Sequence, residues 1–145
     1  MRHRVFGKKL GRDIKERKAL FRSLVSSLIL YGRIKTTYAK AKAIISLIEK
    51  LVTKAKDGSR SQINQIYSFL NRKEPVKKLL DEIAPRFKDK IGGYIRMIRL
   101  GTRTGDNAQE VLMEWTVKEE QKAKIQKALP KTKTQIKKQK VKSKS

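Results

Sequence analysis

The fold of this chain is decided by residues 94–116, which read YIRMIRLGTRTGDNAQEVLMEWT. Apolar and polar side chains alternate over residues 94–100 and again over residues 110–116, and a period of two is typical of a β-strand. Between these stretches lie residues that favour turns, namely Gly101, Gly105, Asp106 and Asn107. The stretch therefore predicts an antiparallel hairpin with a long loop at its tip.

Side chains on facing strands of such a hairpin are close enough to pair. We expect Glu110 or Glu114 to form a cross-strand pair with Arg96 or Arg99. A lone hairpin is marginally stable in water, so its apolar face needs a third strand or packed helices. The short, partly β-branched stretch RIKTT at residues 33–37 is the predicted third strand.

Apolar stripes at helical spacing predict four helices before the hairpin. The first covers residues 13–31. It opens with Asp13-x-x-Glu16, which has the spacing of a capping box, and Gly32 ends it. The second follows Thr37, which can cap it, and ends at residues 57–58.

The third helix is capped by Ser59 or Ser61 and includes Leu70. The fourth is short, with Pro75 at its first helical position and Pro85 closing it. These elements predict an α+β body, with about four helices packed on a small three-stranded sheet that includes the C-terminal hairpin. The aromatic residues assigned to the core or its edge are Phe21, Tyr67, Phe69, Phe87 and Trp115.

Positive charge is concentrated at both ends of the chain. The sequence has 38 Lys and Arg against 13 Asp and Glu, a net charge of +25. Residues 1–22 carry nine cations and two acids (+7), and residues 118–145 carry eleven Lys and two Glu (+9), which leaves +9 for the middle. We therefore divide the chain into a basic arm (1–12), a single globular body (13–117) and a Lys-rich tail (118–145).

The tail is too polar to bury enough surface to offset the entropy of ordering. Residues 118–129 could continue as a solvated helix, and beyond Lys131 we expect order only on an anionic surface. A tail that serves solubility alone is the alternative. A charge of this size opposes compaction unless polyanions neutralise it, which argues against a self-sufficient metabolic enzyme.

Several other functions are excluded by composition. The chain has no Cys and one His, which excludes disulfides and thiolate nucleophiles and leaves almost no material for a metal site. No apolar run approaches the length of a membrane span. The basic N-terminus is similar to a mitochondrial presequence, but Asp13 and Glu16 argue against one. We expect a cytoplasmic chain, mature from Met1, with no membrane, metal, cofactor or small-molecule substrate.

Catalysis has little support because every carboxylate lies among cations or at helix-surface spacing, and Asp106 suits a loop tip. Binding to phosphates has more support, because the arm carries almost only positive charges. Each phosphate that such a charge neutralises releases a counterion, which strengthens binding. Few aromatic residues are free to stack on single strands, and no helix has the composition to read base edges, so folded RNA is favoured. Tyr31, Tyr38 and Phe6 are the possible stacking residues, with packing as the alternative.

Several motifs, in order and in register from residue 1 to about 117, resemble the L17 family of bacterial large-subunit ribosomal proteins. They are MRHR at 1–4, GKKLGR at 7–12, RKALFR at 17–22, IKTT at 34–37, AKAK at 39–42, APRF at 84–87, GGY with Arg96 at 92–96, and GDNA at 105–108. The Lys-rich tail beyond residue 117 lies outside this resemblance.

The resemblance implies a structural constituent of the large ribosomal subunit that touches 23S ribosomal RNA near the exit of the nascent-peptide tunnel. It also implies ribosomal protein L32 as a neighbour, no catalysis, and helices around a small three-stranded sheet. The RNA-binding residues that it implies are Arg2, His3, Arg4, Lys8, Lys9, Arg12, Arg17, Arg22, Lys35, Thr36, Thr37, Lys40, Lys42, Arg86 and Arg96. Arg99 and Arg103 are added from charge alone.

Two alternatives share the basic composition. A nucleoid-associated DNA binder would need a dimer or an element that enters a groove of the duplex. A basic RNA-processing enzyme, or its cofactor subunit, would need a cluster of titratable groups in a cleft.

Overall fold

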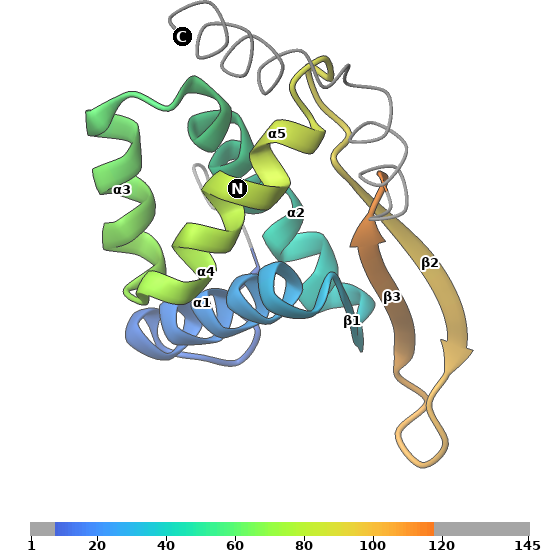
Figure 1. Ribbon diagram of the computed structural model, residues 1–145. Helices are drawn as coiled ribbons and strands as arrows, with labels where there is room; N and C mark the ends of the chain where they lie inside the picture. Colours follow the sequence, from blue (N-terminus) through green and yellow to red (C-terminus); the bar gives the residue numbers. More distant parts are fainter. Residues whose placement is uncertain (1–7, 118–145) are drawn as a thin grey trace, which may run out of the picture.

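In a computed structural model that describes residues 8–117, helices pack beside a three-stranded antiparallel sheet, as Figure 1 shows. The helical elements are α1 (Ile14–Tyr31), α2 (Tyr38–Asp57), α3 (Arg60–Leu70), α4 (Lys73–Lys78), the π-helix η1 (Leu79–Ile83) and α5 (Ala84–Arg86). The strands are β1 (Arg33–Thr37), β2 (Ile95–Thr102) and β3 (Gln109–Trp115). The predicted α+β fold is confirmed. Most of the predicted arm (1–7) and the whole tail (118–145) lie outside the described residues.

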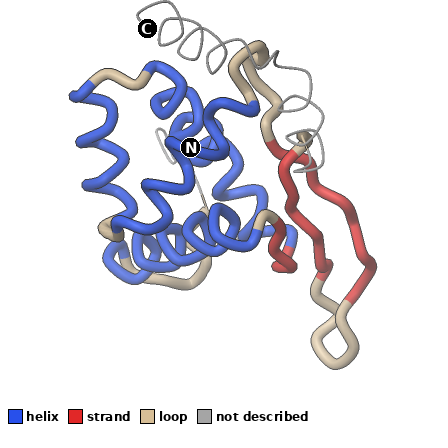
Figure 2. The backbone as a smooth tube through the Cα atoms, in the orientation of Figure 1, coloured by secondary structure: helices blue, strands red, loops and turns tan. Residues whose placement is uncertain are grey.

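The sheet has the order β1-β3-β2, so the last strand in the chain is the central one. Ile34 of β1 and Met97 of β2 both face Met113 of β3 in the register. The predicted hairpin and the predicted third strand at residues 33–37 are therefore both confirmed. The loop between β2 and β3 reaches beyond the helices (Figure 2).

The two faces of the sheet differ because side chains alternate along β3. Val111, Met113 and Trp115 are buried, whereas the residues between them are only partly covered. The open face carries the charge pairs. Arg96 Nη2 lies 2.5 Å from Glu114 Oε1, which confirms one predicted pair.

Glu110, the other acid considered for this pairing, has a different partner. Its carboxylate pairs with Lys35 of β1, whose Nζ lies 2.7 Å away, and not with a cation of β2. A β-bulge between Arg99 and Gly101 shifts the register of β2, so Glu110 faces a glycine on that side. Because β3 is central, Glu110 also has β1 as a neighbour, and β1 supplies the cation.

The helix boundaries follow local signals closely. The backbone N–H of Asp13 donates to Glu16 Oε2 at 3.4 Å, as in the predicted capping box. Gly32 adopts φ +76° and its N–H donates to Leu28 O, so α1 ends in the left-handed conformation that glycine tolerates. Ser59 caps α3, accepting from the N–H of Gln62 at 3.4 Å.

The predicted fourth helix was wrong at both ends. Helix α4 begins at Lys73, so Pro75 is third in the helix, within the first turn where backbone N–H groups need no helical partner. Pro85 does not end the helical path, which continues through η1 into α5. In η1 the N–H of Ala84 donates to Leu79 O, five residues back. This wider turn makes room for a proline ring that would clash with the carbonyl of an ordinary α-helix.

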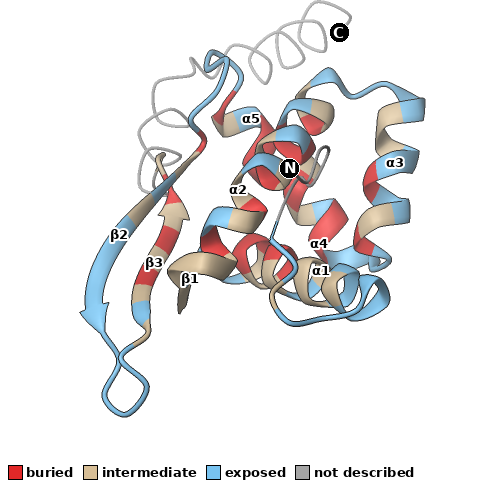
Figure 3. Cartoon of the chain, turned by 180° about the vertical axis from the view of Figure 1, so that it is seen from behind, coloured by how far each residue is buried: buried red, intermediate tan, exposed pale blue. Residues whose placement is uncertain are grey.

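The core lies between the helices and the inner face of the sheet (Figure 3). Leu28, Ile44 and Ile66 are fully buried. The ring of Phe87 meets the ring of Tyr94 edge-on, with centroids 5.1 Å apart, and the ring of Trp115 at 5.9 Å.

The aromatic assignments need two corrections. Tyr67 was assigned to the core or its edge, but it is 41% exposed because it lies on the outer side of α3. Tyr94 was placed in the hairpin strand, but it precedes β2 and is buried, with its hydroxyl near the carbonyl of Ile91 at 3.0 Å.

We predict that Met113→Ala lowers the free energy of unfolding by about 2–5 kcal/mol, because it leaves a cavity in the core. Leu112→Ala is the matched control, since Leu112 is the next residue of the same strand and is only partly buried, on the open face. Urea unfolding followed by circular dichroism measures both variants. Equal losses would contradict the assignment of the two faces.

Candidate nucleic-acid interface

Three cationic groups surround the ring of Tyr38, the first residue of α2. Lys8 Nζ lies 6.0 Å from the ring centroid, Lys42 Nζ 5.9 Å and Arg99 Cζ 5.6 Å. They come from the segment before α1, from α2 and from β2. We call these four residues the Tyr38 cluster.

Local structure explains how these groups meet. Lys42 is one helical turn after Tyr38, so the two side chains share a face of α2. Arg99 faces Val111 in the register and therefore points to the helix side of the sheet. Before α1 the chain turns back at Gly11, which has φ +63°, and the N–H of Arg12 donates to Lys9 O at 3.2 Å.

The cations of the Tyr38 cluster are not neutralised by the protein. No carboxylate among residues 8–117 forms an ion pair with Lys8, Lys42 or Arg99. The face of an aromatic ring attracts cations, by about 0.5–1 kcal/mol at exposed sites, but it does not cancel their mutual repulsion. A bound anion would cancel this repulsion.

The start of α2 adds to this positive potential. Thr37 is its N-cap residue, as predicted, but the side chain makes no cap hydrogen bond, and the first turn contains no acid. The aligned peptide dipoles place partial positive charge at this end. The junction of β1 and α2, where Tyr38 lies, also includes three of the predicted RNA contacts, namely Thr36, Thr37 and Lys40.

Other predicted contacts are engaged within the protein. Lys35 and Arg96 pair with Glu110 and Glu114 on the open face of the sheet. The side chain of Arg86 is only 8% exposed, with Nη2 3.4 Å from Glu82 Oε2. These three cations therefore have carboxylate partners within the protein, whereas the cations of the Tyr38 cluster have none among residues 8–117.

The remaining predicted residues lie at the N-terminal side. Lys9 and Arg12 are exposed, Arg17 is partly buried, and Arg22 Nε donates to the carbonyl of Phe69 at 2.7 Å. Arg2, His3 and Arg4 lie outside the described residues.

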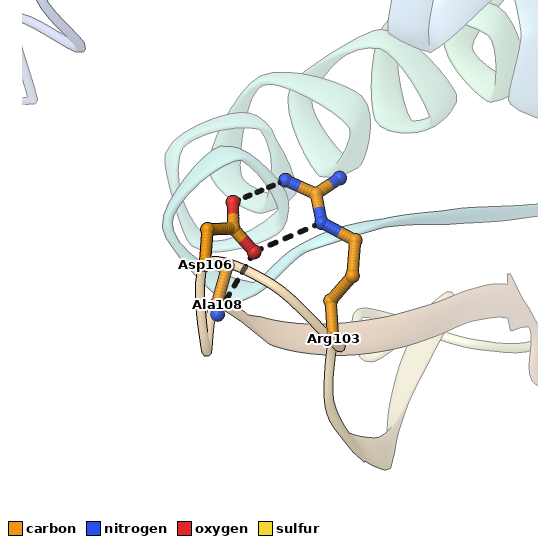
Figure 4. Close-up of polar contacts among 3 residues, drawn as sticks. All are labelled: Arg103, Asp106 and Ala108. Atoms are coloured by element: carbon orange, nitrogen blue, oxygen red, sulfur yellow. Dashed lines mark hydrogen bonds and ion pairs between the residues drawn. The ribbon is translucent and has the colours of Figure 1, made fainter.

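Arg103 is engaged at the tip of the hairpin (Figure 4). Its Nε donates to Asp106 Oδ1 at 3.1 Å and its Nη2 to Oδ2 at 2.5 Å, and the N–H of Ala108 donates to Oδ1 at 3.3 Å. The Arg103 guanidinium, and then the Ala108 N–H, lower the pKa of the Asp106 carboxyl to about 2 from an ordinary 3.8. The Asp106 carboxylate in turn raises the pKa of Arg103. The expected role of Asp106 in a loop tip is confirmed.

Sequence reasoning did not single out Arg33 and Arg72, which are exposed and line hollows in the surface. Arg33 faces Glu114 across the sheet, as Arg96 does from the other side, and this alternation with Lys35 was available in the sequence. Arg72 follows the left-handed Asn71 that ends α3, and no sequence pattern distinguishes it from other surface cations.

Within the described part of the chain, no group of three or more His, Asp or Glu side chains could hold a metal ion. No helix in this part is long and apolar enough to cross a membrane. The hollow lined by Arg22, Ser26 and Arg72 contains neither a carboxylate nor an imidazole. The chemistry that the surface offers is therefore the binding of anions.

Comparison with known proteins gives a consistent result. A family model described as Ribosomal protein L17 matches residues 20–116. The large ribosomal subunit protein bL17 of Thermodesulfovibrio yellowstonii is 50% identical over 115 residues, 79% of this chain and 86% of that protein. The bL17 protein of Dictyoglomus turgidum is 44% identical over 115 residues, 79% of this chain and 99% of its own length.

A longer match reaches into the tail. The bL17 protein of Geobacter metallireducens is 45% identical over 132 residues, which cover 88% of this chain and 74% of that protein. Residues 1–117 make up a smaller share of the chain than this, so the similarity is not confined to them. The family model itself ends at residue 116, just before the tail.

We predict that the hairpin tip loses stability as the pH falls from about 4 to about 2. The folded-state pKa of Asp106 is below its ordinary value, so its contribution is present above pH 4 and is lost as the carboxylate protonates. Carboxyl chemical shifts of Asp106 in an NMR titration measure this. In Arg103→Gln the pKa should move back toward 3.8. A wild-type value near 3.8 would contradict the ion pair.

Proposed function

The chain belongs to the L17 family of ribosomal proteins, and from this premise we propose that it binds folded 23S ribosomal RNA through the Tyr38 cluster and the basic arm. As a member of this family it is a structural constituent of the large ribosomal subunit and not an enzyme. The proposed mechanism is electrostatic. Cations relieve the repulsion between phosphates, so that RNA segments can pack against the protein.

The convergence of Lys8, Lys42 and Arg99 on one ring is the observation that carries this proposal. Three segments far apart in the sequence bring positive charge to one place without a carboxylate partner from residues 8–117. On the open face of the sheet the same protein pairs its cations with Glu110 and Glu114. What distinguishes this surface is that three such cations converge on one ring, and a phosphate backbone is the partner that this arrangement fits.

The proposed interface extends from the Tyr38 cluster along the neighbouring elements. Its strongest members are exposed or lie beside the start of α2, namely Lys8, Lys9, Arg12, Thr36, Thr37, Lys40, Lys42 and Arg99. The predicted contacts that are engaged within the protein, Lys35, Arg86, Arg96 and Arg103, would have to exchange or share a carboxylate partner to reach RNA. Arg17 and Arg22 could contribute from α1, and Arg2, His3 and Arg4 from the arm.

The division into arm (1–12), body (13–117) and tail (118–145) is part of the same proposal. The arm and tail carry most of the net charge of +25 and would bind along the RNA, while the body caps its surface. On the family resemblance we place the protein near the exit of the nascent-peptide tunnel, with L32 as a neighbour. Crosslinking from Lys9 in intact large subunits, with identification of the linked RNA helices and proteins, tests this location.

The DNA-binding alternative has less support from the structure. Duplex readers insert a helix, a β-ribbon or an apolar wedge into a groove. The cations of the Tyr38 cluster instead surround the junction of β1 and α2. Equal affinity for duplex DNA and for fragments of ribosomal RNA would favour the alternative.

We predict that the triple variant Lys8→Gln, Lys42→Gln, Arg99→Gln binds ribosomal RNA of the large subunit more weakly than the wild type. A plot of log affinity against log salt concentration has a negative slope, and its magnitude should be smaller by about 2–3 in the variant, because up to three fewer counterions are released. Filter binding of the full-length protein at several salt concentrations gives the slope. Sedimentation of tagged copies with salt-washed large subunits gives retention on the particle.

The matched control is Lys50→Gln, Arg60→Gln, Lys73→Gln. It removes the same charge from exposed positions outside the proposed interface. Its slope should change by clearly less than that of the first variant. If both triple variants lose affinity equally, net charge alone governs binding and the Tyr38 cluster has no special role.

A further inference from the structure

A second polar surface lies at the C-terminal half of α1. A hollow of about 320 Å³ lies there, and its polar lining residues are Arg22, Ser23, Ser26, Ser27, Tyr31 and Arg72. Five of these side chains come from α1, and Arg72 comes from the turn between α3 and α4. The lining contains two guanidinium groups, three hydroxyls and one phenol, and no acid.

The walls of the hollow are held by contacts to other elements. Arg22 Nε donates to Phe69 O at 2.7 Å, which ties the guanidinium to the end of α3. Asn71 is left-handed with φ +56°, so the chain reverses there and places Arg72 opposite α1. Lys78 Nζ donates to the carbonyl of Leu30 at 2.6 Å, which links α4 to the last turn of α1. The hollow is therefore a formed feature of the fold.

The hydroxyl of Ser26 has no partner in the described structure. Ser26 is 6% exposed, and its Oγ is buried without a hydrogen bond. Buried polar side-chain atoms in folded proteins almost always have a partner from the protein or from a bound molecule. Because Ser26 lines the hollow, rotation of its side chain would offer this hydroxyl to a polar group of a ligand bound there.

A second hollow, of about 280 Å³, also includes Tyr31 in its lining, together with Arg33 and Trp115. The indole Nε1 of Trp115 is likewise buried without a partner among the described residues. The acid in this lining, Glu114, is already paired with Arg96 at 2.5 Å. Tyr31 is 76% exposed and belongs to the lining of both hollows. An exposed ring thus helps to line two hollows, and the lining of each includes cations and a residue with a buried, unpartnered polar atom.

We propose that Tyr31 and the hollow beside Ser26 hold one unstacked nucleotide of the RNA that the protein binds. The base stacks on the Tyr31 ring, the Ser26 hydroxyl bonds a polar atom of the nucleotide, and Arg22 and Arg72 lie near its phosphate. This rests on the proposed RNA-binding function and goes beyond it, since it adds recognition of a looped-out nucleotide to contact with phosphates. Bases displayed in this way are recognised by aromatic stacking and hydrogen bonds, and a cation-rich lining favours RNA over a protein helix.

The first test uses two variants of the full-length protein with large-subunit ribosomal RNA. Tyr31→Ala should weaken binding by about 5- to 150-fold, the range measured for loss of one base–aromatic stack. Tyr67→Ala is the control, because Tyr67 is an exposed tyrosine on α3 that lines neither hollow, and its affinity should not change. Equal effects at the two tyrosines would overturn the proposal.

Ser26→Ala separates ligand binding from a structural role. It removes an unpaired buried hydroxyl, so the free protein should unfold at the same or a higher urea concentration. Binding to RNA should nevertheless weaken by about 2- to 10-fold, the loss of one hydrogen bond. Lower stability of the free protein, or unchanged RNA affinity, would overturn the role of Ser26.

Crosslinking identifies the partner directly. Tyr31→p-benzoylphenylalanine, incorporated into large subunits and irradiated, should link to a single unpaired nucleotide, and the same substitution at Tyr67 should not. A crosslink from position 31 to a protein would show that the hollow holds a polypeptide and would overturn the proposal. If the wild type binds RNA and both Tyr31→Ala and Ser26→Ala match it, only this inference fails. If the wild type does not bind, the proposed function fails with it.

Discussion

The pairing of β1 with β3 is the interaction on which the rest of the structure depends. It joins a strand near the start of the chain to the last strand of the body and makes β3 central. Tyr38 follows β1 directly, and Arg99 lies on β2, on the other side of β3. Without this long-range pairing, nothing would hold the Tyr38 ring close to the Arg99 guanidinium. The same pairing presents the buried side of β3 to the helices, so one set of hydrogen bonds organises both the core and the basic surface.

The protein distributes its acids unevenly over this framework. Glu110 and Glu114 stand on the central strand and neutralise cations of both edge strands, which removes repulsion from the open face of the sheet. Asp106 does the same for Arg103 at the hairpin tip. The cations around Tyr38 receive no such partner from residues 8–117. A protein with this charge can fold by pairing some of its cations internally and leaving the others to a polyanion.

The two basic surfaces differ in what they offer a nucleic acid. The Tyr38 cluster is a group of charges around a partly covered ring, which suits a phosphate backbone of any sequence. At Tyr31 the ring is exposed, and two residues that line the hollows beside it have buried polar atoms without a partner among the described residues, Ser26 Oγ and Trp115 Nε1. Directional groups of this kind select a particular arrangement of atoms, whereas charge does not. A structural constituent of a large particle needs both kinds of contact, since charge supplies affinity for RNA and directional contacts fix the position of the protein on it.

The sequence by itself determined most of the secondary structure and indicated the class of partner, because both depend on local or additive properties. Periodicity located β1 and the hairpin, caps such as Gly32 and Ser59 bounded helices, and net charge pointed to polyanions. Only the tertiary structure decided which cations are free. Glu110 pairs with Lys35 because a bulge shifts the register of β2. The helical path continues past Pro85 because a π-helical turn precedes it. These outcomes depend on register and packing between segments remote in sequence, and no local pattern encodes such distances.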